Sequence, residues 1–297
     1  MNKYLIFRTD RIGDFLLSAI LIKAIKRNDP KSYISVVASK KNLNYVKSFK
    51  IIDEVVLFKK DILHKLKLIN LLNKNKYKAI IIHDSKKRSH FISFFLKTNL
   101  KISLNSNSNI SYFDDIQNIL NRLNFTFDKS DLDTLSNRTY NRLNGLEKNY
   151  VLFHFDEKWI YNEYISNYFN IEPTRNELAS FLNSIVNKTN KNLVVTTGLN
   201  SPIILDKIFS NKFNPRITFF KNLDFFEIEN IIVNSNLLIS CHGAVSHVAS
   251  AKNIKQIDII DESKSNFYKK WTDHFRNYKS INRKNFNDLN NEIVALL

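Results

Sequence analysis

The sequence predicts an α/β fold made of two parallel sheets that follow one another along the chain. Apolar runs of strand length alternate with helical patterns over residues 3–104 and again over residues 150–260. The strands are continuous apolar runs, which is typical of strands buried on both faces of a parallel sheet. A polar stretch at 105–149, rich in Asn, Asp and Ser, separates the two series. We therefore expect two Rossmann-like domains facing each other across a cleft, with ligands at the carboxyl ends of the strands.

The first series opens with a strand at Lys3–Arg8 and a helix at Phe15–Lys26, whose apolar residues fall on one helical face. It forms the N-terminal domain, which we place at residues 1–145, with a linker around Asn141–Asn149. The other predicted strands are Tyr33–Ala38, Glu54–Phe58, Ala79–His83 and Lys101–Leu104, and the other helices are Asn42–Phe49, Ile62–Leu72, Arg88–Leu96 and Tyr112–Leu123.

The second series predicts a C-terminal domain at residues 146–275. Residues 276–297 form a tail whose helix, Asn287–Leu297, we expect to pack back on the first domain. The predicted strands are Tyr150–Phe155, Asn192–Thr196, Arg216–Phe220, Leu237–Ser240 and Lys255–Ile260, and the helices are Arg175–Val186, Ile203–Phe209, Phe225–Asn234 and Val245–Ala251.

Composition limits the kind of protein and its partners. The chain has 297 residues, 43% of them hydrophobic, so it can bury a large core. The net charge of +17 attracts anionic membranes, nucleic acids and phosphorylated substrates, but no nucleic-acid module is visible, so we expect no nucleic acid. Cys241 is the single cysteine, which excludes an internal disulfide and favours a cytoplasmic protein. The four glycines are expected where a side chain does not fit or where φ is positive.

Charged residues interrupt the apolar pattern between the first predicted strand and its helix. Arg8, Asp10, Arg11 and Asp14 stand there together with Gly13. One interpretation is structural, with Asp14 capping the helix and Asp10 pairing with an arginine. The other is catalytic, with a carboxylate taking a proton from an acceptor hydroxyl. The two interpretations are compatible, since a cap fixes the carboxylate in place.

Cations also follow two later strands. Arg88 and Ser89 begin a helix after Lys86 and Lys87, and this is either a solvated helix start or an electropositive rim for a phosphorylated acceptor. Lys158 follows the strand Tyr150–Phe155. It is either an exposed lysine or the cation that neutralises a departing diphosphate.

Two loops of the second half suit a nucleotide. A strand ends at Thr196, Thr197 and Gly198, where hydroxyls and a close backbone form either a nucleotide loop or a simple turn. The segment after Cys241 leads into a helix of small residues, whose N-terminus favours a phosphate. Its candidate binding residues are His242, Gly243, Ala244 and His247, the histidines being either ligands or satisfied core residues.

These segments together resemble glycosyltransferase family 9, the ADP-heptose:lipopolysaccharide heptosyltransferases. The resemblance rests on "RTDRIGDFLLSAILIKAIKR", "AIIIHDSKKRSHFISFFL", "VLFHFDEKWI", "NLVVTTGLNSP" and "NSNLLISCHGAVSHVASAKNIKQIDII", in this order. It implies a GT-B fold, Asp14 as the catalytic base, and Lys158 on the donor diphosphate. It also implies donor contacts from the Thr196–Gly198 loop and the His242–His247 segment, and acceptor contacts from Arg8, Asp10, Arg11, Arg88 and Ser89.

The chain departs from that family at His242, which stands where the family has an aspartate. The donor sugar and its nucleotide therefore stay open. We expect an inverting glycosyltransferase without a metal or cofactor, because Asp131-Leu-Asp133 lies in an irregular polar region and no zinc-type spacing occurs. The expected partners are a nucleotide diphosphate sugar such as ADP-heptose, an anionic glycolipid or oligosaccharide acceptor, and the inner face of the cytoplasmic membrane. A different nucleotide-sugar donor, or a catalytically silent sugar-nucleotide-binding protein, is the alternative.

Overall fold

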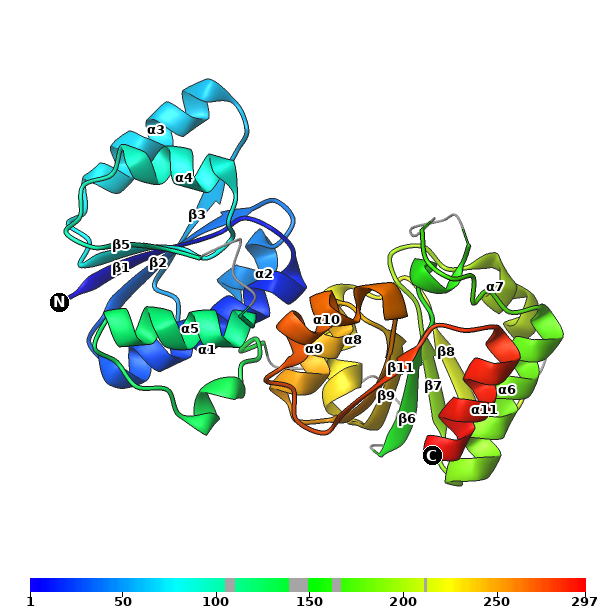
Figure 1. The fold of residues 1–297 in the computed structure, drawn as a ribbon. Helices are drawn as coiled ribbons and strands as arrows, with labels where there is room; N and C mark the ends of the chain where they lie inside the picture. The colour runs from blue at the N-terminus through cyan, green and yellow to red at the C-terminus, as the bar shows by residue number, and fades with distance from the viewer. Residues whose placement is uncertain (105–109, 139–148, 162–166, 211–212) are drawn as a thin grey trace. The chain divides into compact units, whose positions relative to one another are not determined.

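The computed structural model describes residues 1–297 except 105–109, 139–148, 162–166 and 211–212. The chain divides into two compact units (Figure 1). Unit 1 holds Met1–Thr139 and Lys270–His274, and unit 2 holds Tyr140–Lys269 and Phe275–Leu297. The predicted linker at 141–149 lies outside the described residues, apart from Asn149.

Unit 1 is built on a five-stranded parallel sheet in the order β3-β2-β1-β4-β5. The central strand β1 (Lys3–Arg8) is buried from Tyr4 to Arg8, so its carboxyl end lies between those of β2 and β4. The other strands are β2 (Tyr33–Ser39), β3 (Glu54–Phe58), β4 (Ala79–Ile82) and β5 (Lys101–Ser103). The helices are α1 (Ile12–Asn28), α2 (Leu43–Lys47), α3 (Ile62–Asn73), α4 (Lys87–Phe94), α5 (Tyr112–Arg122) and the 3-10 turn η1 (Lys129–Leu132).

Two helices of unit 1 cover one face of this sheet. Leu68 and Leu72 of α3, together with Ile92 and Leu96 of the α4 segment, pack into the same buried cluster as Leu5 and Phe7 of β1. Figure 1 shows α1 and α5 on the opposite face. The switch of faces follows from right-handed crossovers, because α1 leads from β1 to β2 and α4 leads in the other direction, from β4 to β5.

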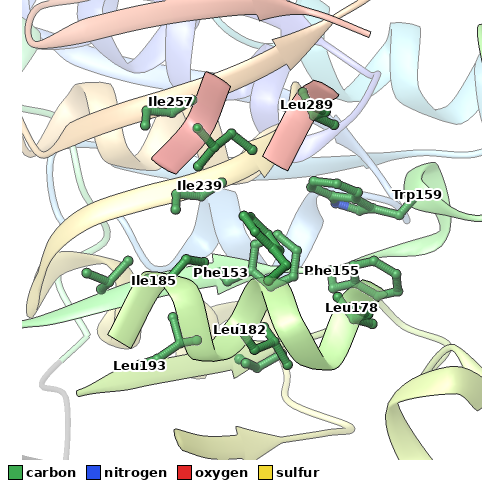
Figure 2. Close-up of a cluster of buried hydrophobic side chains, with 14 of the residues drawn as sticks. Phe153, Phe155, Trp159, Leu178, Leu182, Ile185, Leu193, Ile239, Ile257 and Leu289 are labelled. Atoms are coloured by element: carbon green, nitrogen blue, oxygen red, sulfur yellow. The ribbon is translucent and has the colours of Figure 1, made fainter. Parts of the chain in front are cut away.

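Unit 2 is built on a six-stranded parallel sheet in the order β11-β10-β9-β6-β7-β8. Its core packs Phe153, Phe155 and Trp159 against aliphatic residues of α6 and of the strands (Figure 2). The strands are β6 (Tyr150–His154), β7 (Leu193–Thr196), β8 (Ile217–Phe220), β9 (Ser235–Cys241), β10 (Lys255–Ile260) and β11 (Tyr278–Asn282). The helices are α6 (Arg175–Thr189), α7 (Ile203–Phe209), α8 (Phe225–Val233), α9 (Ala244–Ala251) and α11 (Phe286–Leu296), with 3-10 turns η2 (Glu157–Trp159) and η3 (Glu262–Lys264). Helix α10 (Ser265–Thr272) begins in unit 2, and its residues from Lys270 onward belong to unit 1.

The C-terminal tail differs from the prediction. It adds β11 beside β10 and then packs α11 against α6, with Phe286, Leu289 and Ile293 in the core of unit 2. The expectation that this tail packs on the first domain is therefore wrong. The physical reason is the burial of those three apolar side chains, which complete the core beside Trp159 and Phe181.

Left-handed backbone positions are taken by asparagine in this chain. Asn124, Asn149, Asn190, Asn222, Asn253 and Asn277 all have positive φ, and Ser85 joins them. None of the glycines in the described part of the chain has φ in that range. Of the two expectations for the glycines, a site without room for a side chain applies to Gly198 and Gly243, where a Cβ would crowd Glu157 and Lys158, and the positive φ positions go to Asn, whose short side chain tolerates that conformation.

Candidate functional site

A cavity of about 990 Å³ lies in unit 1, where β1, β2, β3 and β4 end. The loops after these parallel strands meet at one edge of the sheet, the usual ligand site of such folds. The cations that line the cavity outnumber the acidic residues there by eight to four. The cations are Arg8, Arg11, Lys40, Lys41, Lys59, Lys60, Lys86 and Arg88, and the acids are Asp10, Asp14, Asp61 and Asp84. This composition suits an anionic ligand that also meets fixed carboxylates.

Asp14 lies in the first turn of α1 and lines this cavity. Its Oδ2 accepts a hydrogen bond of 2.9 Å from the backbone N–H of Arg11, so the carboxylate acts as a cap. The helix N-terminus stabilises the negative charge at that place. The structural interpretation of Asp14 is thus confirmed, and the cap holds the carboxylate at the edge of the cavity.

Arg8 is held inside the protein at the end of β1. Its side chain is 1% exposed, and its Nε donates to Ser18 Oγ at 2.6 Å. Its Nη2 lies 3.0 Å from His83 Nδ1, and Ser18 Oγ lies 2.7 Å from the same nitrogen. Burial, and secondly the charge of Arg8, hold the pKa of His83 well below its usual value, so the ring is neutral and Nδ1 accepts. Arg8 therefore reaches the cavity edge with its donors largely engaged.

Asp10 is the other partner of Arg8. Its Oδ2 lies 3.2 Å from Arg8 Nη1, whereas its Oδ1 is buried and has no hydrogen-bond partner among the residues that the structure describes. Burial raises the pKa of Asp10 to about 6, although the charge of Arg8 acts against this rise. A carboxyl group in this state binds or releases a proton close to neutral pH, and it lines the same cavity as Asp14.

Asp84 ties the loop after β4 to the loop after β1. Its Oδ2 accepts hydrogen bonds from Thr9 N at 3.0 Å, Thr9 Oγ1 at 2.6 Å and Ser89 Oγ at 2.7 Å. The next residue, Ser85, has φ of 48° and lines the cavity. A non-glycine residue in this conformation costs free energy, and such residues cluster at ligand sites.

The predicted acceptor residues Arg88 and Ser89 have different environments. Arg88 lines the cavity, and its guanidinium donates to Thr9 Oγ1 at 2.8 Å and to the Thr9 carbonyl at 2.7 Å. Ser89 is buried and does not line the cavity, because its hydroxyl is directed to Asp84. Ser89 thus positions the loop, and Arg88 presents the charge.

Sequence reasoning missed four cations of the cavity wall, Lys40, Lys41, Lys59 and Lys60, whereas Lys86 was among the residues expected at an electropositive rim. The sequence does carry a signal for them, since a lysine pair follows directly after each of the strands β2 and β3. Carboxyl ends of neighbouring parallel strands converge, so such repeated pairs predict a shared cationic site.

In unit 2, Lys158 is paired with a carboxylate. Its ammonium contacts Asp156 Oδ2, which also lies 3.7 Å from His154 Nε2. Burial is the largest single influence and acts to lower the pKa of Lys158, but the charge of Asp156 and its hydrogen bond, with smaller contributions from Cys241 and Glu157, together raise it. Burial lowers the pKa of His154 to about 4, so this ring is neutral and bonds Thr196 Oγ1 at 2.9 Å.

The glycines of unit 2 mark close approaches between loops. A Cβ on Gly243 would lie 2.9 Å from Lys158 Nζ, so this ammonium sits beside the N-terminus of α9. A Cβ on Gly198 would overlap with Glu157 Oε2. The structure thus brings Lys158 together with Gly243 and Ala244, and it brings Gly198 and Thr197 beside the same 3-10 turn. A cation and a helix N-terminus side by side favour an anion.

His242 is fixed by a carboxylate that the sequence did not single out. Its Nδ1 lies 2.6 Å from Asp258 Oδ2, and Asp258 Oδ1 accepts from Ser246 Oγ at 2.8 Å. Tyr278 Oη donates to the same carboxylate at 3.2 Å. His247 is buried on α9 with its ring 5.6 Å from that of His242.

The described residues contain no group of three His, Cys, Asp or Glu side chains placed to hold a metal ion. Asp131, of the Asp-Leu-Asp sequence, is fully buried and pairs with Arg27 at 2.9 Å. In the same part of the chain, no helix is both long and apolar enough to cross a bilayer.

Solved structures of other proteins share the fold of this chain. The glycosyl transferase family 9 protein of Veillonella parvula is 13% identical, and the alignment covers 95% of this chain and 86% of that one with a TM-score of 0.70. E. coli heptosyltransferase WaaC with ADP is 9% identical, with 99% and 100% covered and a TM-score of 0.71. The chain has the GT-B fold.

The GT-B fold also occurs in the UDP-GlcNAc 2-epimerase of Methanocaldococcus jannaschii, which is 10% identical. That alignment covers 100% of this chain and 92% of the epimerase with a TM-score of 0.57. The sequence matches no family profile and no curated protein. Since one fold serves several chemistries, the function has to be argued from the sites.

Proposed function

We propose that this protein is an inverting, metal-independent glycosyltransferase. It moves a sugar from a nucleotide diphosphate donor to a hydroxyl of an anionic cell-envelope acceptor. The observation that carries the proposal is Asp14, a carboxylate fixed by the Arg11 N–H at the wall of a cavity with eight cations. The two GT-B transferase structures that share the fold add support.

Asp14 acts as the general base of the proposed reaction. Its carboxylate takes the proton of the acceptor hydroxyl while that oxygen forms a bond to the anomeric carbon of the donor. The bond between this carbon and the diphosphate oxygen breaks with its electron pair, and the configuration inverts. Arg8 stabilises the loop through His83 and Ser18, so Asp14 keeps its place during the attack.

Unit 2 is the proposed donor site. Lys158 and the N-terminus of α9 at Gly243 neutralise the charge that develops on the leaving diphosphate. Thr196, Thr197 and Gly198 form the loop for the nucleotide, and His242, Ala244 and His247 complete the site. Lys158 exchanges part of its pairing with Asp156 for the diphosphate when the donor binds.

Unit 1 is the proposed acceptor site. Asp10, Arg11 and Arg88 line its cavity, and the lysines after β2 and β3 extend the positive charge. An acceptor with phosphate or carboxylate groups matches this charge. The acceptor is a lipopolysaccharide-like glycolipid or its oligosaccharide, reached by peripheral contact with the anionic inner face of the cytoplasmic membrane.

The donor itself has two candidates. The structures of E. coli WaaC with ADP and with ADP-2-deoxy-2-fluoro heptose support ADP-heptose as the donor. His242 favours a different nucleotide sugar, because Asp258 fixes the ring and leaves an imidazole edge where the family has a carboxylate. The nucleoside diphosphate released in turnover distinguishes these two cases.

The test replaces Asp14 by Asn, since the amide oxygen can still accept from Arg11 N–H and preserve the cap. We expect Asp14→Asn to reduce transfer at least about 100-fold while nucleotide binding stays unchanged. Asp61→Asn is the matched control, because Asp61 caps α3, accepts from His64 N and lines the same cavity. Near-normal transfer by Asp14→Asn would show that Asp14 is not the base.

A further inference from the structure

Helices α3 and α4 of unit 1 carry an unusual number of exposed apolar side chains. In the described part of the chain fourteen large hydrophobic residues are exposed, and seven of them lie between residues 62 and 95. We name these seven the α3–α4 face: Ile62, Leu63, Leu66, Leu71, Phe91, Phe94 and Phe95. Phe94 is 77% exposed and Ile62 73%. Such concentration on one layer marks an interaction surface.

The α3–α4 face belongs to a single structural layer. Both helices bury their inner side chains in one core cluster on the same face of the sheet. The ends of the helices are joined, since Asn73 Nδ2 donates to the Phe95 carbonyl at 3.0 Å and Lys97 N donates to Asn73 Oδ1 at 3.2 Å. Figure 1 shows α3 and α4 together at the edge of unit 1. Their exposed residues therefore lie on the outer side of this layer.

The aromatic part of the face is a cluster of three rings. Phe95 lies 5.2 Å from Phe91 and 5.3 Å from Phe94 between ring centroids. All three rings are about half exposed or more. Their neighbours Ile92 and Leu96 point inward and belong to the core cluster, whereas the three rings do not contribute to that cluster.

The surrounding charge is strongly positive. Residues 59–101 contain twelve Lys and Arg and only two acidic residues, Asp61 and Asp84. Apolar side chains that point outward among lysines match the boundary of a bilayer with anionic headgroups. A second copy of this chain would bring the same positive charge to the face, so charge complementarity disfavours self-association.

We infer that the α3–α4 face docks this protein on an anionic lipid surface. The Phe cluster and the residues Ile62, Leu63 and Leu66 enter the headgroup boundary, while lysines such as Lys67 contact the phosphates. This inference deepens the proposed function. Docking itself does not depend on that function, but its purpose, to bring the proposed acceptor site to the membrane, rests on it. Residues Phe58–Asp61 and Lys86 line the cavity and directly precede α3 and α4, so docking presents the cavity wall to lipid headgroups.

The test measures co-sedimentation of the full chain with vesicles, without donor or acceptor. Vesicles of phosphatidylcholine alone are compared with vesicles that also contain phosphatidylglycerol. We expect binding to the anionic vesicles only, weakened roughly tenfold by Ile62→Ser or Phe94→Ser. Lys67→Glu removes one positive charge and adds a negative one, so it should weaken binding by at least about fivefold, the loss expected for one lysine near an anionic surface.

The controls match the variants in position and exposure. Ile203, 72% exposed, is the first residue of α7 in unit 2, just as Ile62 is the first residue of α3. Ile203→Ser and Lys188→Glu, on α6, should leave vesicle binding unchanged. Equal losses in these controls, or no loss in the α3–α4 variants, would overturn the inference.

Two further outcomes separate the alternatives. Binding of a single-stranded polyuridylate that Phe94→Ser abolishes, without vesicle binding, would assign the face to nucleic acid and overturn the lipid assignment. A concentration-dependent dimer that Ile62→Ser dissociates, again without vesicle binding, would assign it to a second copy. Nucleotide binding by unit 2 is measured on the same variants, so failure of lipid docking is distinguished from failure of the proposed function.

Discussion

Replacing Asp10 by Asn should change how the stability of this protein depends on pH. Burial raises the pKa of Asp10 in the folded protein from 3.8 to about 6. The folded state therefore holds this proton more tightly than the unfolded state does. Ionisation of Asp10 costs stability as pH rises from the unfolded pKa near 3.8 to the folded pKa near 6, and the cost is constant above that.

The magnitude follows from the two pKa values of Asp10. A difference of about two units, at 1.36 kcal/mol per unit, gives about 3 kcal/mol over the whole window. Between about pH 4.5 and about pH 7 the change is about 2 kcal/mol. Asn does not titrate, so the free energy of unfolding of Asp10→Asn should gain about 2 kcal/mol relative to the wild type over this interval. The attraction of Arg8 is already contained in the folded pKa of Asp10, so loss of this ion pair adds no further pH dependence to the difference.

Urea unfolding at the two pH values measures the effect. Asp61→Asn is the control of opposite sign, since the backbone hydrogen bond from His64 lowers the pKa of Asp61. That carboxylate stabilises the fold above its unfolded pKa, and the stabilisation is lost as pH falls. Parallel pH profiles for Asp10→Asn and the wild type would refute a raised pKa at Asp10.

Two other substitutions test the packing in unit 2. Trp159→Ala should lower the free energy of unfolding by about 3–5 kcal/mol in urea denaturation, because Trp159 is fully buried against Phe155 and bonds the His154 carbonyl; a loss below about 1 kcal/mol would contradict this packing. Gly243→Ala would push the Lys158 ammonium away and should weaken binding of a nucleoside diphosphate about tenfold in titration calorimetry, with little change in stability. Unchanged affinity would show that the Lys158 ammonium is not part of the donor site.

Periodicity predicted most of the fold. Strands β1, β3 and β10 and helix α7 have the predicted bounds, because each is a continuous apolar run or a clear helical pattern between polar turns. The edge strand β11 was not predicted, since Tyr278–Asn282 is polar and buries only Ile281. An edge strand needs one buried face at most, so its sequence carries little signal.

The candidate sites were predicted in part. Arg8, Asp10, Asp14 and Arg88 line one cavity, as expected of loops after neighbouring parallel strands. The partners of these residues were not predictable, because neighbouring strands far apart in the sequence supply them. His83 reaches Arg8 through the pairing of β4 with β1.

The carboxylate beneath His242 was missed for the same reason. Asp258 pairs in register with Ser240 between β10 and β9, and this register places it against a histidine sixteen residues away. A single buried acid within an apolar run gives no sign of which side chain it meets. The sequence predicted the loops of this site, and the structure shows in addition that Asp258 holds His242 by a hydrogen bond.

Binding of nucleoside diphosphates tests the central claim most directly. The melting temperature of the full chain is measured with ADP, UDP, GDP and CDP, since a ligand that binds only the folded state raises it. At least one of these nucleotides should raise the melting temperature in a concentration-dependent way. The rise should be lost in Lys158→Met and kept in Lys188→Met, an exposed lysine of α6. No rise with any nucleotide, or an equal rise in both variants, would contradict a donor site at Lys158.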